Sequence, residues 1–169
     1  MAYPTNINFK GTGTVIGAQA LSGTQTTQAA PLGQTTRAVD AIKGEGEFIY
    51  LAGVASTAAG DLVIYDPVAG TTTRTVATSR GPVAVAMSAN VAGGFGWYQI
   101  RGYAIVNTTA AGTGAANALL AVTATAGQAT VSGAAGNKID NAICKTAQDA
   151  PGAGFTGVWL MYPSANGNT

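Results

Sequence analysis

Few residues of this sequence have the chemistry of an active site. The chain contains no histidine, so it lacks the commonest general base and metal ligand, and Ser-His-Asp and Cys-His catalysis are excluded. Glu45 and Glu47 stand two apart on an expected strand and therefore share a face, where a carboxylate pair could do acid–base work or hold a divalent cation. Their position around Gly46 favours the other interpretation, a solvated strand edge. The lone Cys144 is expected to be a small apolar residue on a strand. We predict no catalytic residue, no metal ligand and no cofactor, and hence no enzyme.

One strand carries the residue types that favour binding. Trp97, Arg101 and Tyr103 recur at alternate positions with Gln99 between them, and Trp, Arg and Tyr are enriched at the energetic centres of protein interfaces. Three interpretations stay open for this face. It could line a second half of the core, form an interface with a protein partner, or stack on a sugar or a base. Trp97, Arg101 and Tyr103 are the candidate interface residues.

The charge content limits the possible partners. Only 9% of the 169 residues are charged, against about 25% in ordinary soluble domains, and the net charge is +1. Such a chain has no electrostatic field for nucleic acid or an acidic membrane surface, so neither partner is expected. The residues that replace the charges are small, and charged residues are depleted where proteins meet. We therefore expect self-association, although a monomer with a small-residue surface is the simpler alternative.

The chain carries no expected membrane or export signal. Its longest apolar run, 118–122, is far shorter than the roughly 20 residues that span a bilayer. The N-terminus lacks the basic and apolar regions of a signal peptide. We expect synthesis in a cytoplasm.

The elements that must position these residues are short strands. Residues 1–43 are rich in Thr, Gln, Ala and Gly, and are expected to form an extended or flexible N-terminal arm. Residues 44–169 are expected to form a β-rich domain. Asp66, Pro67 and Gly70 predict a turn between two strands, and Gly102 predicts a bulge. The segment 115–124 could be a helix or a strand, and its β-branched end favours a strand. The predicted strands are 47–51, 61–65, 71–76, 82–87, 96–107, 115–124, 128–132, 141–145 and 155–162.

This pattern predicts an all-β fold. Many short strands with Gly-rich turns, and no long segment of helical period, indicate an antiparallel β-sandwich, jelly-roll-like, or a β-barrel. Periodicity does not choose between them.

Several strand phrases resemble a family of head decoration (cement) or structural proteins of tailed bacteriophages. The phrases are GEGEFIYLAGVA (44–55), AGDLVIYD (59–66), TTRTVA (72–77), GPVAVAMS (81–88) and GWYQI (96–100), with a looser likeness in 117–125 and 140–144. The resemblance implies a virion protein, made in the cytoplasm of a bacterial host, that sits on the outer surface of the capsid. Its implied partners are the major capsid (coat) protein and further copies of itself, as a homotrimer or alternatively a dimer. The rival hypothesis is a host-surface or carbohydrate-binding module of a head or tail fibre, motivated by the aromatic face at Trp97 and Tyr103.

Overall fold

The computed structural model describes residues 19–40, 42–109, 116–131, 137–145 and 154–167, and these form an antiparallel β structure. No helix occurs in the described ranges, and hence no helix that could span a membrane. The strands are β1 Thr24–Gln25, β2 Thr35–Asp40, β3 Gly44–Ala52, β4 Leu62–Tyr65, β5 Thr72–Arg74, β6 Arg80–Ala86, β7 Phe95–Asn107, β8 Leu119–Val122, β9 Ala129–Val131, β10 Lys138–Cys144 and β11 Phe155–Asn166. The all-β, antiparallel, sandwich-like fold predicted from the sequence is confirmed.

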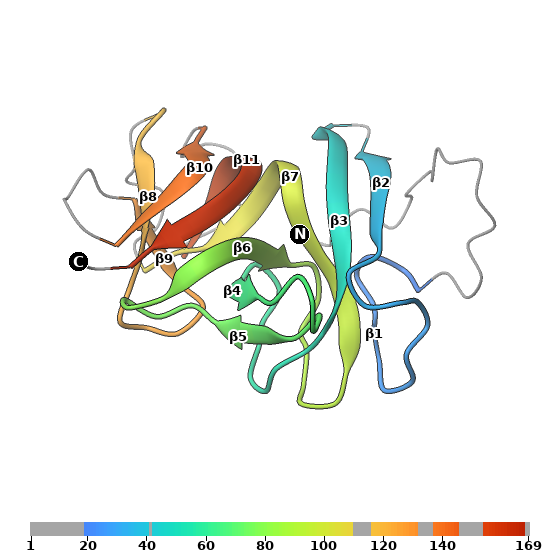
Figure 1. Ribbon diagram of the computed structural model, residues 1–169. Helices are drawn as coiled ribbons and strands as arrows, with labels where there is room; N and C mark the ends of the chain where they lie inside the picture. The colour runs from blue at the N-terminus through green and yellow to red at the C-terminus, as the bar shows by residue number, and fades with distance from the viewer. Residues whose placement is uncertain (1–18, 41, 110–115, 132–136, 146–153, 168–169) are drawn as a thin grey trace.

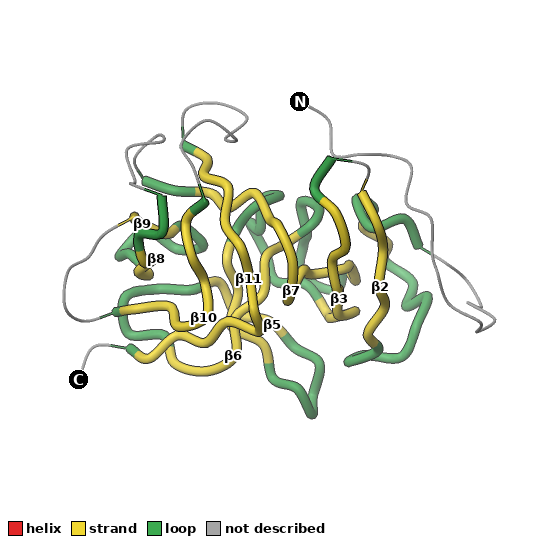
Figure 2. The backbone as a smooth tube through the Cα atoms, turned by 90° about the horizontal axis from the view of Figure 1, so that it is seen from above, coloured by secondary structure: helices red, strands yellow, loops and turns green. Residues whose placement is uncertain are grey.

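The strands form one twisted, open sheet in the order β2-β3-β7-β6-β11-β10-β8-β9. The long strands β7 and β11 pair directly over residues 101–107 and 155–161. They then diverge, and β6 pairs with β11 at its start and with β7 at its end. Figure 1 shows β6 crossing in front of β7 and β11, with β4 and β5 beside it, and Figure 2 shows the same ribbon along one side of the sheet.

Strands β4, β5 and β6 form a ribbon, and this ribbon separates two clusters of buried apolar side chains. Val83 and Val85 of β6 pack into one cluster with β11 and the C-terminal half of β7. Ala84 and Ala86 pack into the other cluster with β3 and the N-terminal half of β7. Alternate residues of β6 thus face opposite clusters, as the pleat of a strand requires. This explains why 82–87 reads as an apolar strand with valines on one face and alanines on the other.

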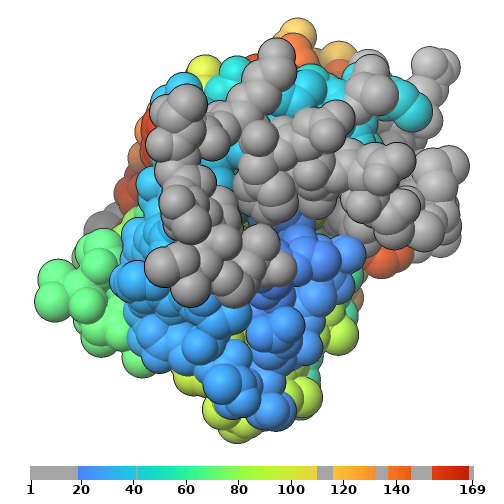
Figure 3. Space-filling view, turned by 90° about the vertical axis from the view of Figure 1, so that its right-hand side faces the viewer, coloured from blue at the N-terminus to red at the C-terminus, as the bar shows by residue number. Residues whose placement is uncertain are grey.

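A third cluster lies on the opposite face of β3 and β7, and it corrects the predicted domain boundary. Phe48, Tyr50 and Trp97 point to this face, where Leu21 is 2% exposed and Leu32 packs beside them. Strand β2 also pairs with β3 along its whole length. Residues 19–40 are therefore part of the folded domain, because without them three large aromatic side chains would face water. Figure 3 shows this stretch (blue) packed on the body of the molecule. Residues 1–18 of the predicted arm (1–43) lie outside the described residues.

The turn and the strands predicted beyond residue 44 are present. The carboxylate of Asp66 accepts hydrogen bonds from the backbone N–H of Val68 and Ala69 at 2.8 and 3.0 Å, and Gly70 has a φ of 67°. The ambiguous segment 115–124 contains strand β8, so the preference for a strand is confirmed. Asp66 supplies side-chain hydrogen bonds to the backbone and Gly70 supplies the positive φ, the two local features that a tight turn needs.

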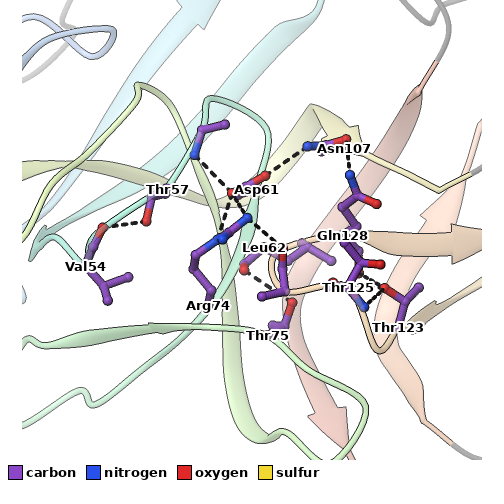
Figure 4. A network of polar contacts seen from close by, with 12 residues as sticks. Val54, Thr57, Asp61, Leu62, Arg74, Thr75, Asn107, Thr123, Thr125 and Gln128 are labelled. Carbon is purple, nitrogen blue, oxygen red and sulfur yellow. Dashed lines mark hydrogen bonds and ion pairs between the residues drawn. The ribbon is translucent and has the colours of Figure 1, made fainter.

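A buried ion pair lies within the ribbon and is hydrogen-bonded to the rest of the sheet. Asp61 is fully buried, and its Oδ2 lies 2.9 Å from Nη2 and 3.1 Å from Nε of Arg74 in β5. The same carboxylate accepts hydrogen bonds from the backbone N–H of Ala58 and from Nδ2 of Asn107 in β7, each at 3.0 Å. Arg74 in turn donates to the carbonyl of Ala126 at 2.7 Å. Figure 4 shows Arg74 of β5 and Asn107 of β7 pointing toward Asp61.

The Asp61–Arg74 ion pair predicts that removing the charge of Asp61 lowers the free energy of unfolding strongly. Asp61→Asn keeps the shape of the side chain but leaves the mostly buried Arg74 without a counter-charge, so we expect the free energy of unfolding to fall by about 3 kcal/mol. Urea denaturation followed by tryptophan fluorescence measures this change. Asp140→Asn, at an exposed carboxylate, is the matched control and should stay within about 0.5 kcal/mol of the parent. Equal effects of both substitutions would refute a stabilising role for the pair.

Candidate interaction surface

Trp97 belongs to the core, which corrects its place in the predicted interface. Its side chain is 3% exposed, and its indole Nε1–H donates to the backbone carbonyl of Gln19 at 3.1 Å. Its ring lies against that of Tyr50 with centroids 5.0 Å apart. The residues that cover it belong to the same chain, so Trp97 has no surface to offer a partner. Of the three interpretations of its face, the core is the one that holds for Trp97.

A bulge in β7 separates Trp97 from Arg101 and Tyr103. The β3–β7 pairing shifts by one residue between Phe48, opposite Gln99, and Glu47, opposite Arg101, so that Ile100 is the extra residue. Gln99 is 4% exposed, and its Nε2 donates to the carbonyls of Arg101 and Tyr103 at 3.1 and 3.0 Å. Gly102 follows with a φ of 95°. The bulge expected at Gly102 is thus confirmed within two residues, and Arg101 and Tyr103, unlike Trp97, are half-buried.

Arg101 belongs to a row of charged residues that crosses the sheet. Arg37 in β2, Glu47 in β3 and Arg101 in β7 are successive cross-strand neighbours. Arg37 lies 3.3 Å from Glu47 and 3.6 Å from Glu45, and Arg101 lies 3.8 Å from Glu45. Glu45 and Glu47 therefore sit together as predicted, but each is engaged by an arginine. Ion pairs on a largely exposed surface contribute little to stability, about 0–1 kcal/mol each.

Strand β11 adds an exposed apolar ridge beside this row. We call Trp159, Met161 and Tyr162 the ridge; they are 37%, 41% and 52% exposed. Trp159 is the cross-strand neighbour of Tyr103, and Met161 is that of Arg101. The sequence analysis missed the ridge because it assigned 155–162 only as a strand. The available signal was the alternation of Trp159 and Met161 with Val158 and Leu160, both of which are buried.

An apolar pocket opens next to the ridge, where β3 and β7 separate. Their pairing ends at Glu47 and Arg101, while β3 continues through Gly44–Gly46 paired with β2. The ammonium of Lys43 lies 5.9 Å from the centre of the Tyr103 ring, within reach of a cation–π interaction. The lining is mainly apolar, and includes Leu21, Ala38, Val39, Phe48, Met87, Gln99, Tyr103 and Ile105.

Tyr162 sits at a kink in β11 with an unusual backbone. Its φ is 55°, although it is bulky and precedes Pro163, two properties that oppose the left-handed conformation. Asn141 in the neighbouring strand β10 has a φ of 58° at the matching irregularity. The phenol of Tyr162 donates to Oε2 of Glu47 at 3.0 Å. This hydrogen bond ties the kink to the charged row and raises the pKa of Tyr162 above its ordinary value of 10.0.

Comparisons with protein-family models, curated proteins and solved structures found no match for this chain. Its function must therefore be argued from the surface itself. Within the described residues no group of three His, Cys, Asp or Glu side chains could hold a metal ion. What the ridge, the charged row and the pocket can do is bind a protein, because they combine Trp, Tyr, Met and Arg on rigid strands.

The bulge predicts a penalty at Gly102. A Cβ at this position would lie 2.5 Å from the carbonyl oxygen of Glu45, whereas a Cβ at Gly44, which also has positive φ, would meet nothing within 4 Å. We expect Gly102→Ala to lower the free energy of unfolding by about 3 kcal/mol, and Gly44→Ala by about 1 kcal/mol, because only the former adds a backbone clash to the left-handed conformation. Chemical denaturation compares the two. Similar losses would show that β3 and β7 are not in close contact here.

The Tyr162–Glu47 contact predicts a change in tyrosine titration. Because the pKa of Tyr162 is raised in the folded state, the stabilisation by this contact is complete below pH 10 and is lost as the pH rises through the folded pKa. Glu47→Gln removes the charge, so we expect the pKa of Tyr162 to fall toward 10.0. The titration of Tyr162 is obtained as the ultraviolet absorbance difference between each protein and its Tyr162→Phe counterpart. Glu45→Gln is the control, and an unchanged titration in Glu47→Gln would contradict the assignment.

Proposed function

We propose that this chain is a structural virion protein that decorates the outside of a tailed-phage capsid and stabilises it by binding coat subunits as a homo-oligomer. The observation that carries the proposal is the exposed ridge of Trp159, Met161 and Tyr162 on a chain with 9% charged residues. Trp, Met and Tyr side chains of this kind are enriched at protein interfaces. The assignment to a phage head rests on the resemblance of the strand phrases.

The mechanism is binding linked to assembly. A protein that binds the expanded shell, and not its dissociated or unexpanded form, stabilises the shell by its binding free energy. Because many copies bind one lattice, modest binding free energies per site add up over the whole shell. A rigid β scaffold suits this task, because the ridge is preorganised and little conformational entropy is lost on binding.

The strand phrases that carry the resemblance lie in β3, β4, β5, β6 and the start of β7. These strands build the scaffold and the buried ion pair, whereas the ridge lies in β11. The resemblance therefore supports a shared scaffold, and the surface supplies the separate support for binding.

The carbohydrate-binding alternative, motivated by Trp97 and Tyr103, loses the Trp97 part of its basis, since Trp97 is buried whereas Tyr103 is half-buried. It now depends on Trp159, whose ring is partly exposed. A glycan array with the parent protein and Trp159→Ala tests it, and binding lost in the variant would favour this alternative over decoration.

We expect the protein on the capsid lattice in a fixed ratio to the coat. Quantitative mass spectrometry of purified heads from the virus that encodes the chain should count copies in a simple fraction of the coat number. A few dozen copies or fewer would favour a fibre or tail role, and absence from the particle would refute the proposal. A role for the first part of the predicted arm is tested by removing residues 1–18 alone, because residues 19–40 help to build the core. Normal head binding by that truncated protein would exclude the arm from the mechanism.

A further inference from the structure

The pocket is an open end of the third core cluster, the one that residues 19–34 cover. Leu21, Ala38, Phe48 and Met87 belong to that cluster and also line the pocket. The pocket has a volume of about 50 Å³. Two water molecules occupy more than this in the liquid, at roughly 30 Å³ each. The pocket therefore has room for one aliphatic side chain, and not for a sugar ring or an indole.

Aliphatic side chains at the mouth of the pocket are also exposed. Val39 lines the pocket and is 38% exposed. Ile42 precedes Lys43, another lining residue, and is 94% exposed. Burial of such side chains is favourable in proportion to the apolar area removed from water. The mouth therefore favours an apolar chain segment over a polar ligand.

We infer that the pocket is the docking site of Ile16 from the same chain, so that residues 15–18 continue the cover that begins at Gln19. The described chain starts at Gln19, two residues before Leu21 in the lining of the pocket. A chain spans at most about 3.6 Å per residue, so Ile16 stays within about 11 Å of Gln19. Val15 and Ile16 are the branched aliphatic residues nearest to this entry point.

Gln19 fixes the point from which the segment departs. It is 3% exposed, and its backbone carbonyl accepts a hydrogen bond from the indole of Trp97 at 3.1 Å. Its Oε1 accepts from the phenol of Tyr50 at 2.9 Å, and its Nε2 donates to the carbonyl of Phe95 at 2.9 Å. Because this anchor keeps the tether short, Ile16 of the same chain has a higher effective concentration at the pocket than a segment of a second copy.

This inference goes beyond the proposed function and does not depend on it, since it concerns the free protein. Docking leaves the ridge available, because the pocket takes one side chain and none of the ridge residues lines it. Tyr103 does line the pocket, and it is the cross-strand neighbour of Trp159 in the ridge. Docking of Ile16 therefore determines where residues 1–14 leave the domain, beside the surface assigned to the coat.

Denaturation of the full chain in urea, followed by tryptophan fluorescence, tests the docking. We expect Ile16→Asp to lower the urea concentration at the midpoint by about 1 M, because a carboxylate cannot enter an apolar pocket without a partner. Ile7→Asp makes the same change in the same segment and is the control, which should leave the midpoint unchanged. Equal midpoints for Ile16→Asp and the parent, or equal losses in both variants, would overturn the inference.

Disulfide formation tests whether Ile16 lies at the pocket of its own chain. A chain carrying Ile16→Cys and Val39→Cys should form a disulfide within one chain under mild oxidation, whereas the parent, with only the buried Cys144, should form none. Ile7→Cys with Val39→Cys is the matched control, and loop length alone makes its closure about eightfold slower. We expect docking to raise this difference well above tenfold. A ratio of tenfold or less, or disulfide-linked dimers from the Ile16 pair, would overturn the inference.

Discussion

The buried carboxylate of Asp61 is the constraint on which the arrangement of strands depends. Moving an ionised carboxylate out of water costs several kcal/mol, and only well-placed donors offset that cost. Here the donors come from Arg74 in β5, Asn107 in β7 and the backbone of Ala58. Arg74 belongs to the same β4–β5–β6 ribbon, whereas a different placement of the ribbon against β7 would remove the hydrogen bond from Asn107. The Asn107 contact therefore favours one docking of the ribbon, beyond what apolar packing alone would determine.

The position of the β4–β5–β6 ribbon determines which face of β3 and β7 must be covered by another part of the chain. Because β4 and β6 occupy one side of β7, the near half of β7 and β3 bury Tyr98 and Ile49 against them. The opposite side of the same strands presents Phe48 and Tyr50, and the chain from residue 19 to 34 closes over it. Strands buried on both faces leave little room for charged side chains. The low charge content, first read as a sign of assembly, is thus partly a property of the interior.

The sequence predicted the strands well where local chemistry determines them. The turn at Asp66–Gly70 follows from side-chain-to-backbone hydrogen bonds within a few residues, and β7 follows from a long alternating run. The packing of residues 19–40 was missed because this stretch has few large apolar side chains of its own. The signal lay in its partner, since the unbroken run from Phe48 to Leu51 requires cover on two faces. The Asp61–Asn107 contact joins residues 46 apart and depends on register, which no local pattern encodes.

Non-local packing also explains why, of the candidate interface residues, Trp97 is buried whereas Arg101 and Tyr103 are half-buried. A period of two assigned Trp97, Arg101 and Tyr103 to one face, but the bulge at Ile100 interrupts that face, and the segment from residue 19 covers its first part. The surface that remains is built at irregular positions, with Gly102 at the bulge and Tyr162 at the kink of β11. Bulges redirect side chains next to functional sites, and backbone strain persists only where its surroundings hold it. At Tyr162 the hydrogen bond to Glu47 is one such restraint. A scaffold that served only to bury its core would have no need of a strained tyrosine at a strand kink, beside a partly exposed tryptophan and methionine. The coincidence of strain and exposure along β11 is therefore the strongest physical reason to locate the function of this protein there.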